Sequence, residues 1–435
     1  MKTLSNVIEQ PENDEDTSQK KHQTSYFETL IHLFKAGIGA GCFAMGEAVG
    51  KTGIILSVVL IAFLSFICLY EQHVLLKCAN NVKRFYNLKE RPDYAVTFEM
   101  SMQANEKWKK YSVLMKRIVN ICLILTQLGF CSVYILFIGH NVQSVLSYFG
   151  YDLQLRVVTM FALLPIIIPA LITNLKFLAP FSGIASVCML TGIGITMFYI
   201  CQDLPEITER KLVVLSWMQL PLFFGTVMYL FENIGLVLPL KNAMKNPSNF
   251  TKAAGVLNVG VGMQTILYIF LGVFGYWKYG KEVEGSLTLN LPQDDKLVQS
   301  TLLILSIGVV LGYAIQFFIP IEIMFPSVQN MIKPAVRYPM TAEILFRAFM
   351  VLVTFGVASV VPNLGLLISL IGTICSNSLA LLFPVLIEYL VVTRDDKSMT
   401  IWFMFKNGII LILAIVGFLS GGYESVRQII VLYQS

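Results

Sequence analysis

Residues 34–41 read Phe-Lys-Ala-Gly-Ile-Gly-Ala-Gly, so that three glycines stand at alternate positions within an otherwise apolar stretch of the chain. Each glycine inside a helix costs about 1 kcal/mol relative to alanine. A second interruption, Phe231-Glu232-Asn233-Ile234-Gly235, places two polar residues in the middle of another apolar stretch. Both stretches therefore predict a helix that is broken near its middle.

The composition identifies the solvent around these stretches. Of the 435 residues, 56% are hydrophobic and 14% are charged, whereas a soluble domain carries about 25% charged residues. So few charges cannot form the polar surface of a soluble protein of this length. Soluble enzymes, secreted disulfide-rich domains and disordered regulators are excluded, and the remaining class is an all-α membrane protein.

Eleven apolar segments are each long enough to cross a membrane as a helix, which takes about 20 residues. The predicted spans are 28–50, 52–77, 115–140, 154–174, 179–201, 214–240, 252–277, 298–325, 342–361, 363–391 and 403–421. The first five fall within residues 28–201 and the next five within 213–391. Residues 1–27 are expected to form a disordered cytosolic N-tail, and residues 422–435 an extracytosolic C-tail.

The basic residues predict the orientation, because cytosolic loops are enriched in Lys and Arg. When sides are assigned alternately from a cytosolic N-terminus, 21 of the 32 Lys and Arg residues fall in cytosolic segments and 8 in extracytosolic ones. The N-terminus is therefore expected in the cytosol. With an odd number of spans, the C-terminus is expected outside.

The two interruptions fall in the first span of each half of the chain. Five spans per half mean that the halves insert with opposite orientation, which is the inverted repeat of many secondary transporters. Close packing through small residues is an alternative explanation for Gly37 and Gly41, which are four residues apart. The equivalent positions of the interruptions in the two halves favour broken helices.

A broken helix exposes backbone N–H and C=O groups that lipid cannot satisfy, so these groups must line a cavity or bind a ligand. Helix N-termini attract a carboxylate, and free carbonyl groups attract a cation. Such a site suits a zwitterion, and a free amino acid is the expected substrate. The predicted substrate-binding residues are Gly37, Ile38, Gly39, Ala40, Gly41, Phe231, Glu232 and Asn233.

Two ionisable residues close to the interruptions are candidates for proton coupling. Glu232 lies at mid-membrane depth, where a carboxylate costs about 2.5–3.5 kcal/mol, although a fixed hydrogen bond across the break could also explain it. His32 lies about one helical turn before the glycines, and a hydrogen-bonded packing role is its alternative. Glu388 is expected near a cytosolic helix end. Glu71 is expected nearer an interface, as a structural or solvated residue.

Five stretches of the chain carry a family resemblance: residues 30–41, 231–240, 275–280, 285–292 and 316–322. They resemble, in order, motifs of the proton-coupled amino acid transporter (PAT) family of the amino acid/auxin permease superfamily, and residues 41–46 are similar to its insect branch. The resemblance implies a LeuT-type fold, with two inverted five-helix repeats and one further helix. It also implies that His32 matches a histidine needed for proton coupling. The chain departs from the family pattern at Gly37, Gly46, Asn233 and Lys241.

The residues and the resemblance together predict a secondary active transporter that carries small neutral amino acids with protons into the cytosol by alternating access. The alternatives are a proton-independent or sodium-coupled amino acid carrier, and an amino acid sensor (transceptor) with cytosolic signalling partners. No catalytic set, metal site, cofactor or nucleic-acid partner is expected, so the protein is not predicted to be an enzyme. The plasma membrane and a lysosomal or endosomal membrane both fit this prediction.

Overall fold

The computed structural model describes residues 23–173, 175–331, 337–394 and 400–434, so the predicted N-tail lies outside these residues as far as residue 22. Within these ranges the protein is helical, apart from one isolated bridge between Thr24 and Met244. The main helices are α1 (Tyr26–Gly37), α2 (Met45–Thr52), α3 (Ile54–Phe85), α4 (Tyr94–Gln103), α5 (Ser112–Tyr148), α6 (Leu155–Ala170), α7 (Leu175–Ile200), α8 (Gln219–Leu230), α9 (Ile234–Ala243), α10 (Val256–Tyr279), α11 (Lys296–Met331), α13 (Pro339–Val360), α14 (Leu364–Ile371), α15 (Phe383–Arg394), α16 (Ile401–Val416) and α17 (Gly422–Gln434).

The described residues form nine helices that are long and apolar enough to cross a membrane, or ten if the bent pair of α1 with the helical segment 40–52 counts as one span. Each of the eleven predicted spans contains a helix. The segment that falls short is α6, with 16 residues. At 1.5 Å per residue it is about 24 Å long, less than the roughly 30 Å hydrocarbon core of a bilayer.

The first predicted break is confirmed. A capping box begins α1, in which the Ser25 side chain accepts from the Glu28 N–H and the Glu28 side chain accepts from the Ser25 N–H. The helix ends at Gly37, and Ile38 is extended with φ −92° and ψ 94°. The chain turns by 51° before the segment 40–52. This segment starts with a 3₁₀ helix, η2 (Ala40–Ala44), which continues into α2.

The second predicted break is also confirmed. Helix α8 ends at Leu230 and α9 begins at Ile234, so that residues 231–233 are not helical. Asn233, which precedes α9, has φ −113° and ψ 3°, outside the α-helical region. The polar pair Glu232-Asn233 therefore lies in the break itself.

A third irregularity has no counterpart in the sequence predictions. The predicted span 363–391 contains two π-helical segments, η8 (Gly372–Ser376) and η9 (Ser378–Leu382), between α14 and α15. A further π-helical segment, η10 (Gly417–Gly421), joins α16 to α17. Residues 422–434 of the expected C-tail thus form a helix that continues the last span, while the side of the membrane they occupy stays a prediction.

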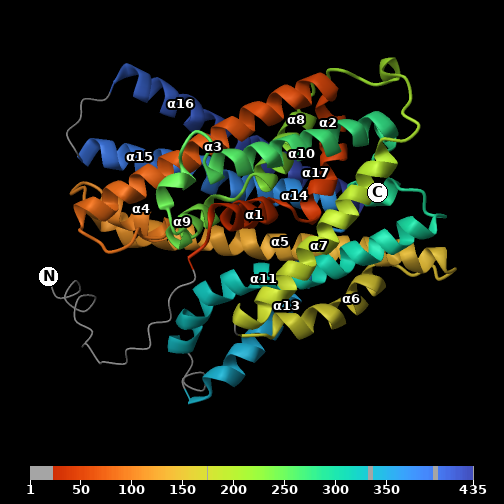
Figure 1. Ribbon diagram of the computed structural model, residues 1–435, viewed down its shortest axis with the longest axis horizontal. Helices are drawn as coiled ribbons and strands as arrows, with labels where there is room; N and C mark the ends of the chain where they lie inside the picture. The colour runs from red at the N-terminus through yellow and green to blue at the C-terminus, as the bar shows by residue number, and fades with distance from the viewer. Residues whose placement is uncertain (1–22, 174, 332–336, 395–399, 435) are drawn as a thin grey trace.

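The broken helices lie inside the bundle. Helix α10 contacts α1, α2 and α3, and α8 contacts α14 and η8. Helices α6, α11 and α13 contact one another and lie together at the lower edge of Figure 1, whereas α15 and α16 lie at the opposite edge. The two breaks are therefore surrounded by other helices of the same chain.

The contact between α8 and η8 depends on two glycines. A Cβ atom on Gly372 would lie 1.8 Å from the carbonyl oxygen of Gly225, and a Cβ atom on Gly225 would lie 2.4 Å from the carbonyl oxygen of Ser369. These neighbours are backbone atoms, so no side-chain rotation relieves the clash. The two backbones can approach this closely only because both residues are glycine.

We expect Gly372→Ala to destabilise the protein by about 1–3 kcal/mol, the usual cost of overpacking a core. The matched control is Gly356→Ala in α13, where a Cβ atom meets no other atom within 4 Å. Thermal unfolding of the two purified variants in detergent measures the difference. Equal Tm values for the variants and the wild type would contradict the close contact.

Candidate functional site

Helix α10 joins the two breaks through Tyr268. Its side chain is 0% exposed, and its hydroxyl donates to the carbonyl oxygen of Gly37 at 2.6 Å and lies 3.3 Å from that of Leu230. These are the last carbonyl groups of α1 and α8, which have no partner within their own helices. One hydroxyl group therefore contacts both broken helices where each of them stops.

Gln264, one turn earlier on the same face of α10, makes a second connection. Its Nε2 donates to the carbonyl oxygen of Leu33 at 2.9 Å, and its Oε1 accepts from Nδ2 of Asn233 at 2.9 Å. Asn233 is thereby tied to α1 through a single side chain. The sequence analysis missed both Gln264 and Tyr268. The sequence signal that could have identified them is a pair of polar side chains four residues apart, on one face of an apolar helix.

The glycines of the first break accommodate side chains of the same protein. A Cβ atom on Gly37 would lie 2.4 Å from Nε2 of Gln264, and one on Gly41 would lie 2.4 Å from Cε1 of Tyr229. A Cβ atom on Gly39 would lie 2.9 Å from the Tyr134 hydroxyl oxygen. Close packing and helix breaking are therefore both true of this segment, because the turn brings polar and aromatic side chains against the bare backbone.

The structure brings most of the predicted site residues together but sets one apart. Gly37, Ala40 and Gly41 of the first break are buried, Ile38 and Gly39 are half-buried, and Phe231, Glu232 and Asn233 of the second break are buried. The ring of Phe231 lies 5.3 Å from that of Tyr268, centroid to centroid. His32 differs, because its side chain is exposed on the outer face of α1. Its role stays a prediction.

Glu232 is the charged residue at the centre of this arrangement. Its side chain is 7% exposed, and its Oε1 has no hydrogen-bond partner among the residues that the structure describes. Nor does it form an ion pair within those residues. A buried carboxylate is unfavourable without a partner, so Glu232 is suited to bind a proton or an ammonium group.

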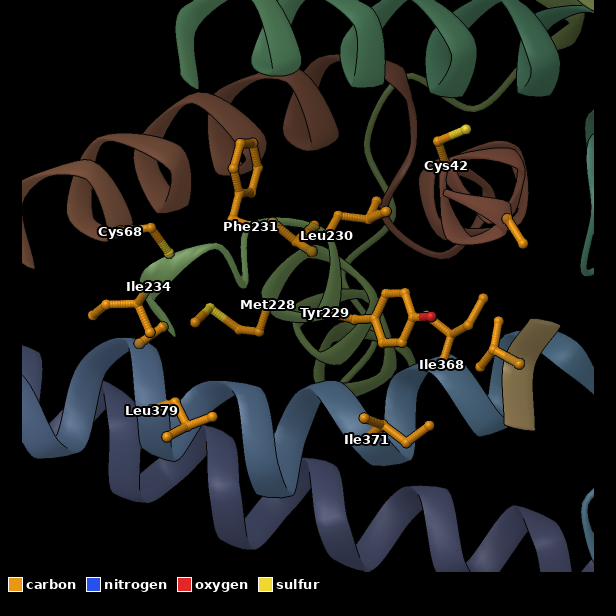
Figure 2. Packing of buried hydrophobic residues seen from close by; sticks show 14 of the residues in the cluster. Cys42, Cys68, Met228, Tyr229, Leu230, Phe231, Ile234, Ile368, Ile371 and Leu379 are labelled. Carbon is orange, nitrogen blue, oxygen red and sulfur yellow. The ribbon is translucent and has the colours of Figure 1, made fainter. Parts of the chain in front are cut away.

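Two aromatic side chains, Tyr229 and Phe231, flank the end of α8 just before Glu232 in the chain. Figure 2 shows Tyr229 and Phe231 pointing in different directions from the end of α8, with Tyr229 near Ile368 of α14. The Tyr229 ring also packs edge-on against Phe130, with centroids 4.5 Å apart. Together with the helix N-terminus at Ala40, the region combines backbone groups, one carboxylate and apolar walls, which is the chemistry that an amino acid zwitterion requires.

Both ends of the broken helices are held by further polar contacts. On the α1 side, the Thr24 N–H donates to the carbonyl oxygen of Ala243 at 2.9 Å, and the Lys245 N–H donates to that of Thr24 at 3.0 Å. The ammonium group of Lys35 binds Ser182 of α7. The start of α1 is thus tied to the end of α9, and its last turn is tied to α7.

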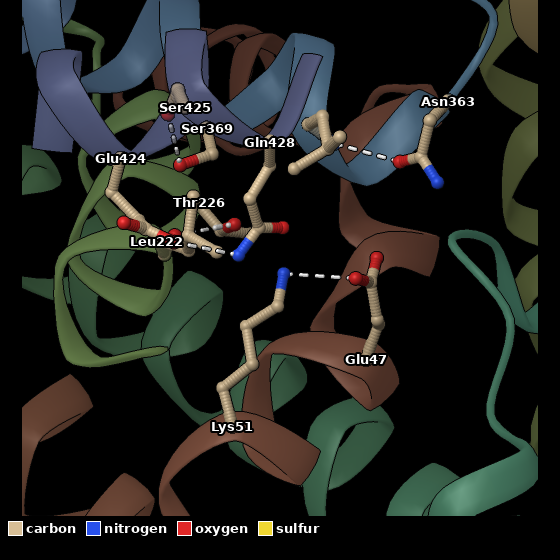
Figure 3. A network of polar contacts seen from close by, with 10 residues as sticks. Glu47, Lys51, Leu222, Thr226, Asn363, Ser369, Glu424, Ser425 and Gln428 are labelled. Carbon is tan, nitrogen blue, oxygen red and sulfur yellow. Dashed lines mark hydrogen bonds and ion pairs between the residues drawn. The ribbon is translucent and has the colours of Figure 1, made fainter. Parts of the chain in front are cut away.

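On the α2 side, Glu47 lies against the start of α14. Its carboxylate pairs with Lys51 at 2.8 Å, and a Cβ atom on Gly365 would lie 1.9 Å from its Oε2. Figure 3 shows this pair beside Asn363, whose side chain caps α14 by accepting from the Leu366 N–H at 2.9 Å. A carboxylate at a helix N-terminus is electrostatically favourable, so Glu47 holds α2 against α14.

Comparison with known proteins agrees with this geometry. The transmembrane amino acid transporter protein family matches residues 22–427. The chain is 34% identical over 417 residues to the proton-coupled amino acid transporter-like protein pathetic of Drosophila melanogaster, with 95% of this chain and 87% of that protein covered. It is 25% identical over 423 residues to the probable amino acid transporter skat-1 of Caenorhabditis elegans, with 92% and 89% covered. The crystal structure of MhsT in complex with L-phenylalanine superimposes with a TM-score of 0.57 at 12% identity, over 92% of this chain and 99% of that one.

The fold and the joined breaks define a multi-pass membrane protein of the LeuT type. Within that class, the chain belongs to the transmembrane amino acid transporter family. The predicted resemblance is thereby confirmed. The relatives are transporters and not enzymes.

We expect Tyr268→Phe to destabilise the joined breaks by about 1–3 kcal/mol, because it leaves two buried carbonyl groups without their donor. Where this free energy is lost from the substrate-binding conformation, uptake of labelled L-alanine should fall about 5- to 150-fold. Thermal unfolding and uptake are measured together.

The matched control is Tyr313→Phe, which removes another fully buried hydroxyl. The Tyr313 hydroxyl lies 2.8 Å from Thr354 Oγ1, and that group keeps its own bond to the Val351 carbonyl oxygen at 2.8 Å. Equal effects of the two variants on uptake would refute a special role for Tyr268.

Proposed function

We propose that the protein carries small neutral amino acids together with protons into the cytosol by alternating access. The observation that carries this proposal is the pair of helix breaks, which Tyr268 and Gln264 hold together; the second break contains the buried Glu232, whose Oε1 has no hydrogen-bond partner among the described residues. Broken helices of this kind form the substrate site in many secondary transporters.

Within this proposal, the backbone of residues 37–41 and of Phe231 binds the substrate carboxylate and ammonium groups. Glu232 binds either the proton or the substrate ammonium group, and Asn233 holds the second break in register with α1. The side chains of Tyr229 and Tyr134 already occupy the space beside Gly41 and Gly39, and in this proposal they limit the size of the substrate side chain. The names of the Drosophila and Caenorhabditis relatives support amino acids as the substrate class, and the Drosophila name supports protons as the coupling ion.

The proposal includes eleven membrane crossings, arranged as two inverted repeats of five helices and one further helix. The ten apolar spans and the shorter α6 support this count. The basic residues support a cytosolic N-terminus and an extracytosolic C-terminus. Under that orientation the start of α1 and the end of α9 meet on the cytosolic side through the Thr24 contacts, which in this proposal close the path from the site to the cytosol. Either the plasma membrane or a lysosomal or endosomal membrane suits transport in this direction.

Uptake of labelled L-alanine is expected to rise as the external pH falls from about 7.5 to about 5.5, with or without sodium. Two pH units supply about 2.7 kcal/mol per proton, or about a hundredfold in equilibrium accumulation. Uptake that depends on sodium and not on pH would show the sodium-coupled alternative. Binding of alanine without any uptake would show a sensor.

The two candidate proton residues are separated by Glu232→Gln and His32→Gln. Because a neutral amide cannot bind the proton, Glu232→Gln is expected to abolish the pH dependence of uptake. His32→Gln is expected to flatten the uptake profile around the usual imidazole pKa of about 6.5. A wild-type pH profile in either variant removes that residue from proton coupling. Surface expression is measured alongside to exclude loss of folding.

A further inference from the structure

A second buried carboxyl group lies in the same bundle. Glu71 of α3 is 0% exposed, and neither of its carboxylate oxygens has a hydrogen-bond partner in the part of the chain that the structure describes. The expectation that Glu71 is solvated is therefore wrong, whereas the alternative, a structural role nearer an interface, stays a prediction. A carboxyl group in such a place is more stable with a bound proton than as an unpartnered anion.

The nearest opposite charge is already engaged with another carboxylate. Lys406 of α16 forms an ion pair with Glu388 of α15 at 2.8 Å and also binds the Tyr70 hydroxyl. Asn407 donates to the same Glu388 oxygen at 3.0 Å. Glu388 acts more strongly than Lys406 on Glu71, so the pair does not compensate a negative charge there.

A cavity approaches this group from the end of α3 that is expected on the cytosolic side. It has a volume of about 470 Å³, and its walls include Cys78, Asn81 and Glu388. Cys78 follows Glu71 by seven residues, so it lies two turns further along the same face of α3. The distance along the helix axis is about 10 Å. Glu71 therefore lies about two helical turns from a residue that lines this cavity, on the same face of α3.

In the other direction along the same face of α3, the helix approaches the second break. Cys68, one turn before Glu71, lies beside Ile234 at the second break in Figure 2. The hydroxyl of Tyr94, at the start of α4, donates to the Leu379 carbonyl oxygen at 2.6 Å. Burial raises the pKa of Tyr94, and the carboxylates of Glu71 and Glu232 raise it further. Tyr94 thus lies within electrostatic reach of both carboxylates.

The other titratable groups around this part of α3 have their own partners or face the cavity. His73 contacts Asn258 of α10 at 2.7 Å, and Arg394 of α15 donates to Asn81 at 2.6 Å. Lys77 and Arg84 line the cavity. His73 and Arg394 are thus engaged by amide side chains, and Glu71 forms no ion pair with any of these basic groups within the described residues.

Resting on the proposed proton coupling, we propose that Glu71 is a second proton-binding residue, which receives the proton released at Glu232 and passes it to water in the cavity beside Glu388. In the first step an O–H bond breaks at the Glu232 carboxyl group and one forms at the Glu71 carboxylate. In the second step the Glu71 O–H bond breaks and water accepts the proton. The proton can then leave Glu232 while the contacts between α1 and α9 on the cytosolic side stay closed.

The full-length protein is tested in liposomes with an imposed pH gradient. Glu71→Gln is expected to reduce both proton-driven net uptake of labelled L-alanine and the internal acidification at least about tenfold, as for loss of a proton-transfer group. Exchange of labelled for unlabelled alanine at equal concentrations is expected within about twofold of wild type, because exchange requires no net proton release. Glu71→Asp, which keeps a carboxyl group, should restore part of the net uptake.

The matched control is Gln72→Leu, which changes the adjacent residue, also buried (2% exposed) and not ionisable. It should retain coupled uptake. Two results would overturn the proposal that Glu71 binds the proton. One is wild-type net uptake by Glu71→Gln. The other is an equal loss of exchange and net uptake in both Glu71 variants at normal expression. If Glu232→Gln abolishes coupling and Glu71→Gln does not, only this inference fails. If wild-type uptake is independent of the pH gradient, the proposed coupling fails and this inference fails with it.

Discussion

Hydrogen bonds from α10 to the backbone of two broken helices are the interactions on which the rest of the structure depends. A helix that stops inside an apolar bundle leaves carbonyl groups without partners, and neither lipid nor a packed core can satisfy them. Tyr268 and Gln264 supply the missing donors, and Gln264 also accepts from Asn233. Because the same face of one helix serves both breaks, the breaks must lie side by side. Their proximity creates the central site.

The irregular backbone of this protein is concentrated around that site. Helix α8, which ends in the second break, packs through Gly225 against the π-helical segment η8. Rings from α5 and α8 fill the space beside the glycines of the first break. Glu47 holds α2 against α14, and Thr24 joins the start of α1 to the end of α9. The two segments of the first span therefore contact different neighbours.

The carboxylates inside the bundle divide by their partners. Glu47, Glu343, Glu388 and Glu424 each form an ion pair with a basic side chain of the same chain. These pairs join or stabilise helices and keep charge balanced away from water. Glu232 and Glu71 are buried without such partners in the described residues. The difference lies in the neighbours of each carboxylate and not in the residue type, and it marks the two groups that are suited to carry a proton.

The sequence by itself determined the membrane class, the helical spans and the position of both breaks, because apolar length and interruptions such as Gly37-Ile38-Gly39 are local properties of the chain. It also singled out Glu232, since charge is rare at that depth. The tertiary structure alone decided that Gln264 and Tyr268 join the breaks, that His32 faces outwards and that Glu71 is buried. Those facts depend on which face of a helix meets which neighbour. The apolar pattern of a lipid-embedded helix does not encode that choice, because its lipid-facing and buried sides are equally apolar.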